Sequence, residues 1–225
     1  MFYEPDKENH GLKYNPFKSC VVPRPIGWIT TLSDDGRVNL APFSQFNIVG
    51  FDPGYVMFSA NRHPPDWRRK DSSDNAERRG EFVYNMATWD LRQQVTRSSQ
   101  IYDPAISELE AVGLTTAPSR TIKTPRVAES PISYECKYYT TLCLPGDSIG
   151  TSHYLVVGKV VGVHIADDAI SEDGKVDVAR IKPLARLGYA DYTYVDKVIA
   201  IDLIDDWHGQ EQAAEHNRYG LFGGR

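Results

Sequence analysis

The chain has 225 residues, 41% of them hydrophobic and 24% charged, with a net charge of −5. This length fits one large domain better than two, and the composition is that of a globular protein with a core. The acidic balance argues against a nucleic-acid-binding protein, because phosphate neutralisation needs a basic face. The polar N-terminus lacks the features of a signal peptide, no apolar stretch is long enough to span a bilayer, and the three scattered cysteines indicate no disulfide framework. We therefore expect a cytoplasmic protein without membrane or nucleic-acid partners.

Two strands joined by a turn are the first predicted elements, within residues 21–50. The turn is Asp34-Asp35-Gly36-Arg37, and an Asp-Gly pair between apolar runs is a strong hairpin signal because glycine tolerates positive φ. A third strand is predicted over residues 55–60. The thirteen Tyr, eight Phe and four Trp favour such half-buried strands.

Polar side chains interrupt this hairpin. Thr30 and Thr31 fall in its first strand, and Ser44, Gln45 and Asn47 fall in the second. Buried polar groups are costly unless they are hydrogen-bonded. A polar ligand edge would satisfy them.

A basic segment follows. Residues 61–70 are rich in Pro and Arg and are predicted to form a loop, after which Asp71 or Ser72 caps a helix that runs to Arg79 and ends at Gly80. Cations followed by hydroxyls at a helix start suit a phosphate. Alone, this cluster fits a solvated basic loop better; the polar strand residues strengthen the phosphate interpretation.

The rest of the chain predicts further strands and few helices. Residues 81–87 form a strand, Thr88 caps a second helix over residues 89–99, and residues 106–113 form a short helix. Two long strands cover residues 134–144 and 153–166. The second is apolar on both faces, so we expect the barrel core to cover one face and a helix or second subunit the other. The predicted class is mainly β, with an antiparallel barrel preferred.

Most catalytic motifs are absent, with one match. Dinucleotide-binding, Walker and zinc-protease patterns do not occur, and the histidines lack metal-ligand spacing. Residues 146–150 fit GxSxG, which acts as a nucleophile elbow only between a strand and a helix. Here strands flank it, so a hairpin loop is the better interpretation.

Several motifs together resemble a known family. They are HGLKYNPF from His10, VVPRPIGWITTLSDDGRVNLAPFSQFN, FDPGYVMFS, Lys70-Asp71-Ser72 with Asn75, GEFVYNMA, GKVVGVHI and PLARLGYADY. In this order they resemble the flavin reductase-like, FMN-binding split-barrel family, in the branch of flavoredoxin and two-component monooxygenase reductases. The resemblance covers residues 10–200, within a split-barrel domain placed at residues 1–205; residues 206–225 would be a C-terminal arm or tail.

The resemblance implies a six-stranded Greek-key split barrel that forms a homodimer and holds FMN, or FAD as an alternative, between its subunits. The implied cofactor-binding residues are Arg24, Trp28, Thr30, Thr31, Ser44, Asn47, Ser59, Lys70, Asp71, Ser72, Asn75, His164 and Tyr189. Of these, Thr30, Thr31, Lys70, Asp71 and Ser72 would meet the phosphate and ribityl chain. Ser44 and Asn47 would lie near the flavin ring. No catalytic residue is assigned and no metal is expected.

Some of these residues have simpler explanations, which stay open here. His164 lies among valines, where a satisfied buried histidine is the default. Trp28 is at least as well explained by core packing. Arg24 fits a ligand contact or a surface ion pair equally. Residues 61–69 form an insertion relative to the family that would reshape access to the flavin ring.

The resemblance implies an NAD(P)H-dependent flavin reductase that passes hydride through flavin N5 to free flavin or a partner oxygenase. The alternative is a flavin-binding electron-transfer or sensor protein without reductase turnover, if the insertion covers the ring. A weaker alternative is another split-barrel chemistry, such as haem binding or pyridoxine-phosphate oxidation.

Overall fold

The computed structural model describes residues 1–103 and 106–199, so the predicted C-terminal arm lies outside the described residues. Its strands are β1 (Arg24–Pro25), β2 (Gly27–Leu32), β3 (Val38–Phe43), β4 (Phe46–Phe51), β5 (Gly54–His63), β6 (Arg68–Arg69), β7 (Glu81–Met86), β8 (Thr116–Ala117), β9 (Arg126–Val127), β10 (Ile132–Leu144), β11 (His153–Ile165), β12 (Leu184–Gly188) and β13 (Asp191–Tyr194). The helices are α1 (Asp71–Arg79), α2 (Arg92–Arg97), α3 (Glu108–Ala111) and α4 (Val178–Ile181), with short 3-10 turns that include η3 (Ile149–Thr151) and η4 (Asp167–Ala169). No helix in the described ranges is long and apolar enough to cross a membrane.

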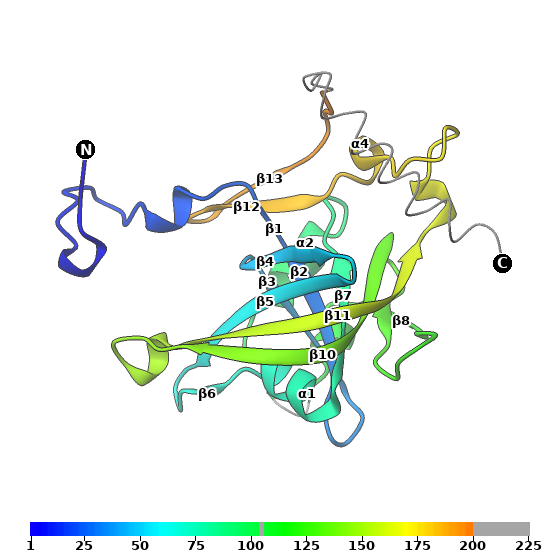
Figure 1. Cartoon of the computed structure of the whole chain (residues 1–225), viewed down its shortest axis with the longest axis horizontal. Coiled ribbons are helices and arrows are strands. Elements are labelled where there is room, and N and C mark those ends of the chain that lie inside the picture. Colours follow the sequence, from blue (N-terminus) through cyan, green and yellow to red (C-terminus); the bar gives the residue numbers. More distant parts are fainter. Residues whose placement is uncertain (104–105, 200–225) are drawn as a thin grey trace.

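The main sheet is antiparallel and curls on itself (Figure 1). Its strand order is β3-β2-β7-β10-β11-β5-β4, with β6 paired to β5. The two strands at the ends of this path, β3 and β4, are joined by only Ser44 and Gln45. So short a link brings the end of β3 next to the start of β4, which bends the sheet into a barrel.

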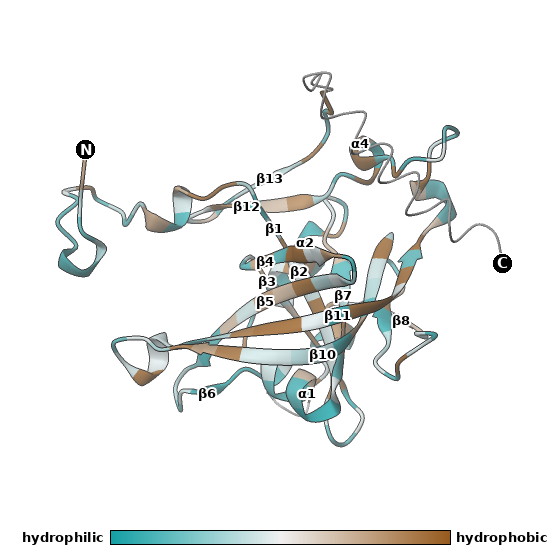
Figure 2. Cartoon of the chain, in the orientation of Figure 1, coloured by the Kyte–Doolittle hydropathy of each residue, from teal (hydrophilic) through white to brown (hydrophobic). Residues whose placement is uncertain are grey.

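Aromatic side chains fill the barrel. Phe58 and Phe82 are fully buried, with ring centroids 5.3 Å apart, and Phe46 of β4 stacks on Tyr84 of β7 at 4.4 Å. Hydrophobic segments accordingly mark β5 and β11, whereas α1 is mostly hydrophilic (Figure 2). The mainly β barrel with few short helices, predicted from the sequence, is confirmed.

A second hydrophobic cluster lies outside the barrel. Trp28, Leu40, Val95, Leu109 and Leu184 are buried together, which packs α2, α3 and β12 against the first hairpin. β1, β12 and β13 form a small sheet that lies across one side of the barrel, and the N-terminal segment extends away from it (Figure 1).

The predicted hairpin is correct in its turn but not in its second strand. Gly36 has φ +84°, and β2 pairs with β3 from Gly27↔Phe43 to Leu32↔Val38. The chain then leaves β2: Ser44 and Gln45 form the link, and Asn47 lies on β4, which pairs with β5. Sequence alternation alone does not reveal such a change of partner.

Two other predicted boundaries are wrong. The expected loop begins later than residue 61, because β5 continues to His63 and pairs with β6 around a turn at Pro64–Trp67. α2 begins at Arg92, because Thr88 forms a β-bridge with Pro183 and does not cap a helix. Tertiary pairing overrides the local capping signal here.

The two long strands are confirmed, with a difference in burial. β10 and β11 pair along nearly their whole length around the GxSxG sequence, which forms the predicted hairpin loop. Val163 and Ile165 at the end of β11 are 54% and 37% exposed, so the second face of this strand is not fully covered within one chain.

Candidate functional site

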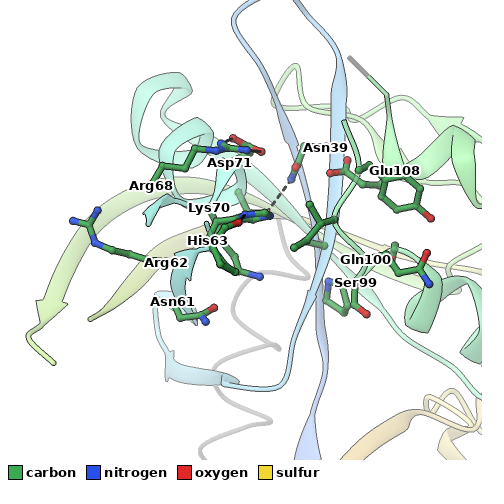
Figure 3. Close-up of a pocket in the computed structure, with 17 residues that line it drawn as sticks. Asn39, Asn61, Arg62, His63, Arg68, Lys70, Asp71, Ser99, Gln100 and Glu108 are labelled. Carbon is green, nitrogen blue, oxygen red and sulfur yellow. Dashed lines mark hydrogen bonds and ion pairs between the residues drawn. The ribbon is translucent and has the colours of Figure 1, made fainter. Parts of the chain in front are cut away.

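Lys70 lines a pocket of about 220 Å³ between β3, the β5–β6 turn, the start of α1, residues 98–102 and Glu108 (Figure 3). Lys70 occupies the N-cap position of α1 in an extended conformation, so the prediction that Asp71 or Ser72 caps this helix is wrong; Gly80 ends the helix at φ +72°, as predicted. In Figure 3, Lys70, Arg62 and His63 lie on one side of the pocket and Asn39 and Glu108 on the other.

Lys70 differs from the two arginines before it. Arg68 is paired with Asp71 at 2.5 Å, and Arg69 with Asp74 and Glu77 at 2.8 and 2.7 Å. No hydrogen bond or ion pair of the Lys70 ammonium occurs within the described ranges; its Nζ lies 5.9 Å from the centre of the Phe43 ring. Burial lowers the pKa of Lys70, an effect that the nearby Asp71 carboxylate only partly offsets. The pocket thus presents an incompletely compensated cation.

A hydroxyl–amide network supports the pocket beside Lys70. Asn39 Nδ2 donates to Ser72 Oγ at 2.9 Å and to Thr31 Oγ1 at 3.3 Å. Asn75 Nδ2 donates to Thr31 Oγ1 at 3.2 Å. Thr31, Ser72 and Asn75 are buried. The structure therefore brings together Thr31, Lys70, Asp71, Ser72 and Asn75 from the predicted set.

Two pocket components were missed by the sequence analysis. Asn39 could have been found, because the Asp-Gly turn sets a register in which Asn39 lies opposite Thr31. Residues 98–102 and Glu108 carry no motif. Residues 98–102 follow α2 and Glu108 begins α3, and both helices pack against β3. Glu108 accepts a hydrogen bond from Leu40 N at 3.2 Å, and burial raises the pKa of its carboxyl group.

Three predicted residues make hydrogen bonds within the protein that do not involve Lys70. Thr30 Oγ1 donates to Pro125 O at 2.8 Å inside the protein, and Trp28 Nε1 donates to Ser98 Oγ at 2.9 Å. Arg24 donates to the carbonyls of Lys18 and Val21. These contacts fit core packing and local backbone support.

The remaining predicted residues lie outside the Lys70 pocket. His164 Nε2 is 2.5 Å from Glu135 Oε1, and Ser59 Oγ is 3.3 Å from His153 Nδ1. Asn47 is exposed on β4, Ser44 is half-buried in the link, and Tyr189 is half exposed with its ring against Tyr14. One chain does not gather these residues around Lys70.

Comparison with known proteins identifies the family of this chain. Residues 19–196 match the family described as "Flavin reductase like domain". The chain belongs to the flavin reductase-like family. A Halalkalibacterium halodurans protein is 34% identical over 186 residues, which are 83% of this chain and 88% of that protein.

Solved structures of the family share the split-barrel fold. Nitrilotriacetate monooxygenase component B from Bacillus cereus has a TM-score of 0.80 at 28% identity, covering 89% of this chain and 98% of that one. The 2-nitrobenzoate 2-nitroreductase of Pseudomonas fluorescens has a TM-score of 0.76 at 29% identity, covering 91% and 96%.

The pocket fits part of a flavin nucleotide. The uncompensated Lys70 charge and the Ser72 hydroxyl suit a phosphate, which accepts charge-assisted hydrogen bonds. Pockets that enclose a complete cofactor-sized ligand usually measure about 300–1,000 Å³, more than the 220 Å³ found here. The phosphate end therefore fits the pocket of one chain, and the ring needs additional surface.

Proposed function

We propose that this protein is a cytoplasmic FMN-binding oxidoreductase that uses NAD(P)H to reduce flavin. The electrons would go to free flavin or to a partner oxygenase, and FAD is the alternative cofactor. Lys70 is the observation that carries this proposal. It is a partly buried cation without a direct carboxylate partner in the described ranges, in a chain of the flavin reductase-like family.

The residues around Lys70 would hold the phosphate and position the cofactor. FMN supplies the hydride chemistry at its N5 atom. Lys70 contributes charge, Ser72 contributes a hydroxyl, and Asn39 fixes the Ser72 side chain through its 2.9 Å hydrogen bond. Thr31 and Asn75 support Asn39 and the start of α1 from the protein interior.

A homodimer would supply the surface that one chain lacks. β4 is an end strand of the sheet path and exposes Ile48, Val49 and Phe51, the last at 84%. Exposed apolar residues on an edge strand favour association. In such a dimer, Ser44 and Asn47, which flank the start of β4, would approach the flavin ring.

Similarity to a monooxygenase component B supports an oxygenase as the acceptor of reduced flavin. Similarity to a nitroreductase supports direct reduction of a small acceptor as well. Both roles begin with flavin reduction, so the first experiment addresses that step.

The experiment is an anaerobic titration of the holoprotein with NADH and, separately, NADPH. The visible spectrum is recorded, and the molecule released by heat is identified by mass spectrometry. Bleaching of the flavin bands by either nucleotide supports the reductase. A colourless protein that does not bind added flavin contradicts the whole proposal, and a Soret band would instead identify haem.

The second candidate is an electron-transfer or sensor protein without reductase turnover. Arg62, His63, Pro64 and Arg68 of the insertion line the pocket, which supports restricted access to a bound ring. This candidate predicts a flavin that dithionite reduces but that neither nicotinamide nucleotide bleaches.

A further inference from the structure

A second hollow, of about 370 Å³, lies between α2 and the β12–β13 hairpin. Trp89, Leu184 and Tyr192 supply most of its apolar lining, and Arg92 and Arg97 of α2 supply its charge. We call it the α2 groove. It shares no lining residue with the Lys70 pocket.

Planar groups pack against Trp89, which lines the α2 groove. The rings of Tyr194 and Trp89 are 4.6 Å apart at an interplanar angle of 33°, and the Arg92 guanidinium lies 4.1 Å from the centre of Trp89. Arg92 Nη1 also donates to Trp89 O at 2.8 Å, which holds the guanidinium in place. A planar guanidinium stacks on aromatic rings. Arg92, which also lines the groove, is thus a planar cation on which a further ring can stack.

The charges of the α2 groove are unbalanced. Across residues 1–103 and 106–199, its lining includes no Asp or Glu, and neither Arg92 nor Arg97 forms an ion pair. Arg186 lies 4.4 Å over the Tyr192 ring and is likewise unpaired in those ranges. Arginines elsewhere in this acidic chain, such as Arg68, Arg69 and Arg78, do have carboxylate partners. The groove thus combines apolar planes with cations that lack counter-ions.

We propose that the α2 groove binds an aromatic ring that carries an anionic group. The ring would stack on Arg92 beside Tyr192, and the anion would accept hydrogen bonds from Arg97. Among the described residues, the Arg97 guanidinium makes a single hydrogen bond, of 3.3 Å to Ala111 O. Two sources share this chemistry: an aromatic carboxylate, and a nucleotide with its base and phosphate. The proposal does not depend on flavin binding at Lys70.

Calorimetric titration of the full-length protein tests it, with benzoate and AMP as probes and the neutral analogues benzamide and adenosine as controls. We expect at least one anion to bind with a Kd of about 1 mM or tighter, and its neutral analogue at least about tenfold more weakly, because a hydrogen bond to a charged group is lost. If only benzoate binds, the groove is a site for aromatic carboxylates. If only AMP binds, it is a nucleotide site, and if both bind, it accepts either class of aromatic anion.

Two variants locate the binding. Arg92→Gln and Arg97→Gln should each weaken binding of the anion about tenfold; Arg97 is exposed. Arg79→Gln makes the same charge change at an exposed position of α1 and should not weaken binding. FMN affinity should stay unchanged in Arg97→Gln, which separates the α2 groove from the Lys70 pocket. Failure of both anions to bind, equal binding of neutral analogues, or equal weakening by Arg79→Gln would overturn the proposal.

Discussion

The surroundings of Lys70 leave its positive charge only partly compensated, and a bound anion would compensate it. Its ammonium is partly withdrawn from water and has no direct carboxylate partner within the described ranges, which is why its pKa is lowered. A folded-state pKa below the unfolded value means that the charged form opposes folding at neutral pH, and that this cost disappears as the pH rises above the unfolded pKa. A phosphate beside Lys70 would remove the cost at neutral pH.

Replacing Lys70 by methionine should therefore separate binding from stability. We expect Lys70→Met to weaken FMN binding at least about tenfold, because a charge-assisted hydrogen bond is lost, while the melting temperature of the flavin-free protein stays equal or rises. Fluorescence titration and thermal denaturation measure the two effects. Lys137→Met on exposed β10 is the control; a similar loss of affinity there would argue against a specific phosphate site.

At the scale of elements, side chains replace backbone pairing to hold residues 119–127 on the barrel. The buried Glu135 carboxylate accepts from Arg120 N and Thr121 N, each at 2.7 Å. Glu81 accepts from Lys123 N and Thr124 N, and Asn85 Oδ1 from Val127 N at 2.8 Å. Two strands thus anchor one loop through carboxylates.

The pKa of Glu135 makes this anchor sensitive to acid. Burial acts to raise the pKa, but hydrogen bonds from His164, Thr121 and Arg120 outweigh it and lower the pKa to about 2. A depressed carboxyl pKa contributes stability above the unfolded value of 4.5, and this contribution is lost as the pH falls from there towards about 2. We expect the protection of the Arg120 and Thr121 amides, relative to their intrinsic exchange rate at each pH, to fall across this range.

Glu135→Gln should abolish most of that pH dependence and expose the same two amides already at pH 7. Hydrogen exchange followed by mass spectrometry measures this. Unchanged protection at Arg120 and Thr121 in the variant would show that the carboxylate does not anchor the loop.

Two glycines on adjacent strands provide a matched test of barrel packing. A methyl group at Gly158 on β11 would overlap the buried Phe82 ring and lie 3.1 Å from Cys136 Cβ, whereas one at Gly54 on β5 would make an ordinary 3.6 Å contact with Val160. We expect Gly158→Ala to lower the free energy of unfolding by about 1–3 kcal/mol and Gly54→Ala to change it by less than about 0.5 kcal/mol. Urea denaturation compares them; equal effects would contradict this account of the core.

At the scale of the whole molecule, the exposed apolar residues of β4 predict where the subunits of the proposed dimer would meet. A charge at Val49, which is 54% exposed, would be buried without a partner in the complex. Val49→Glu should therefore shift the protein from dimer to monomer in light scattering and weaken flavin binding. Ile170→Glu, at an exposed site in the loop after η4, should leave both unchanged. A wild type that is monomeric with flavin bound would exclude this arrangement.

The parts that could be predicted from the sequence are those set by local chemistry. The Asp-Gly turn set the β2–β3 register. The cationic run before Asp71 and the glycine at position 80 indicated where α1 begins and ends. Contacts between distant segments could not be derived this way: Glu108 reaches the pocket through α3, and β4 changes partner after only two residues. The family resemblance supplied the barrel; its assignment of Arg24, Thr30 and His164 to the flavin site stays a prediction, because one chain alone does not bring these residues to the Lys70 pocket.

The GxSxG sequence at the tip of the β10–β11 hairpin packs against the β5–β6 turn. Ser148 is engaged with Thr151 in a small capping arrangement, and a side chain at Gly150 would lie 2.6 Å from the Trp67 indole. Trp67 belongs to the β5–β6 turn, and its carbonyl accepts from Arg62, a pocket residue, at 2.7 Å. The GxSxG sequence, which matches a hydrolase motif, is thus the surface on which the Trp67 indole packs. A displacement of this hairpin tip would move Trp67 and, through the hydrogen bond to its carbonyl, Arg62 at the rim of the Lys70 pocket.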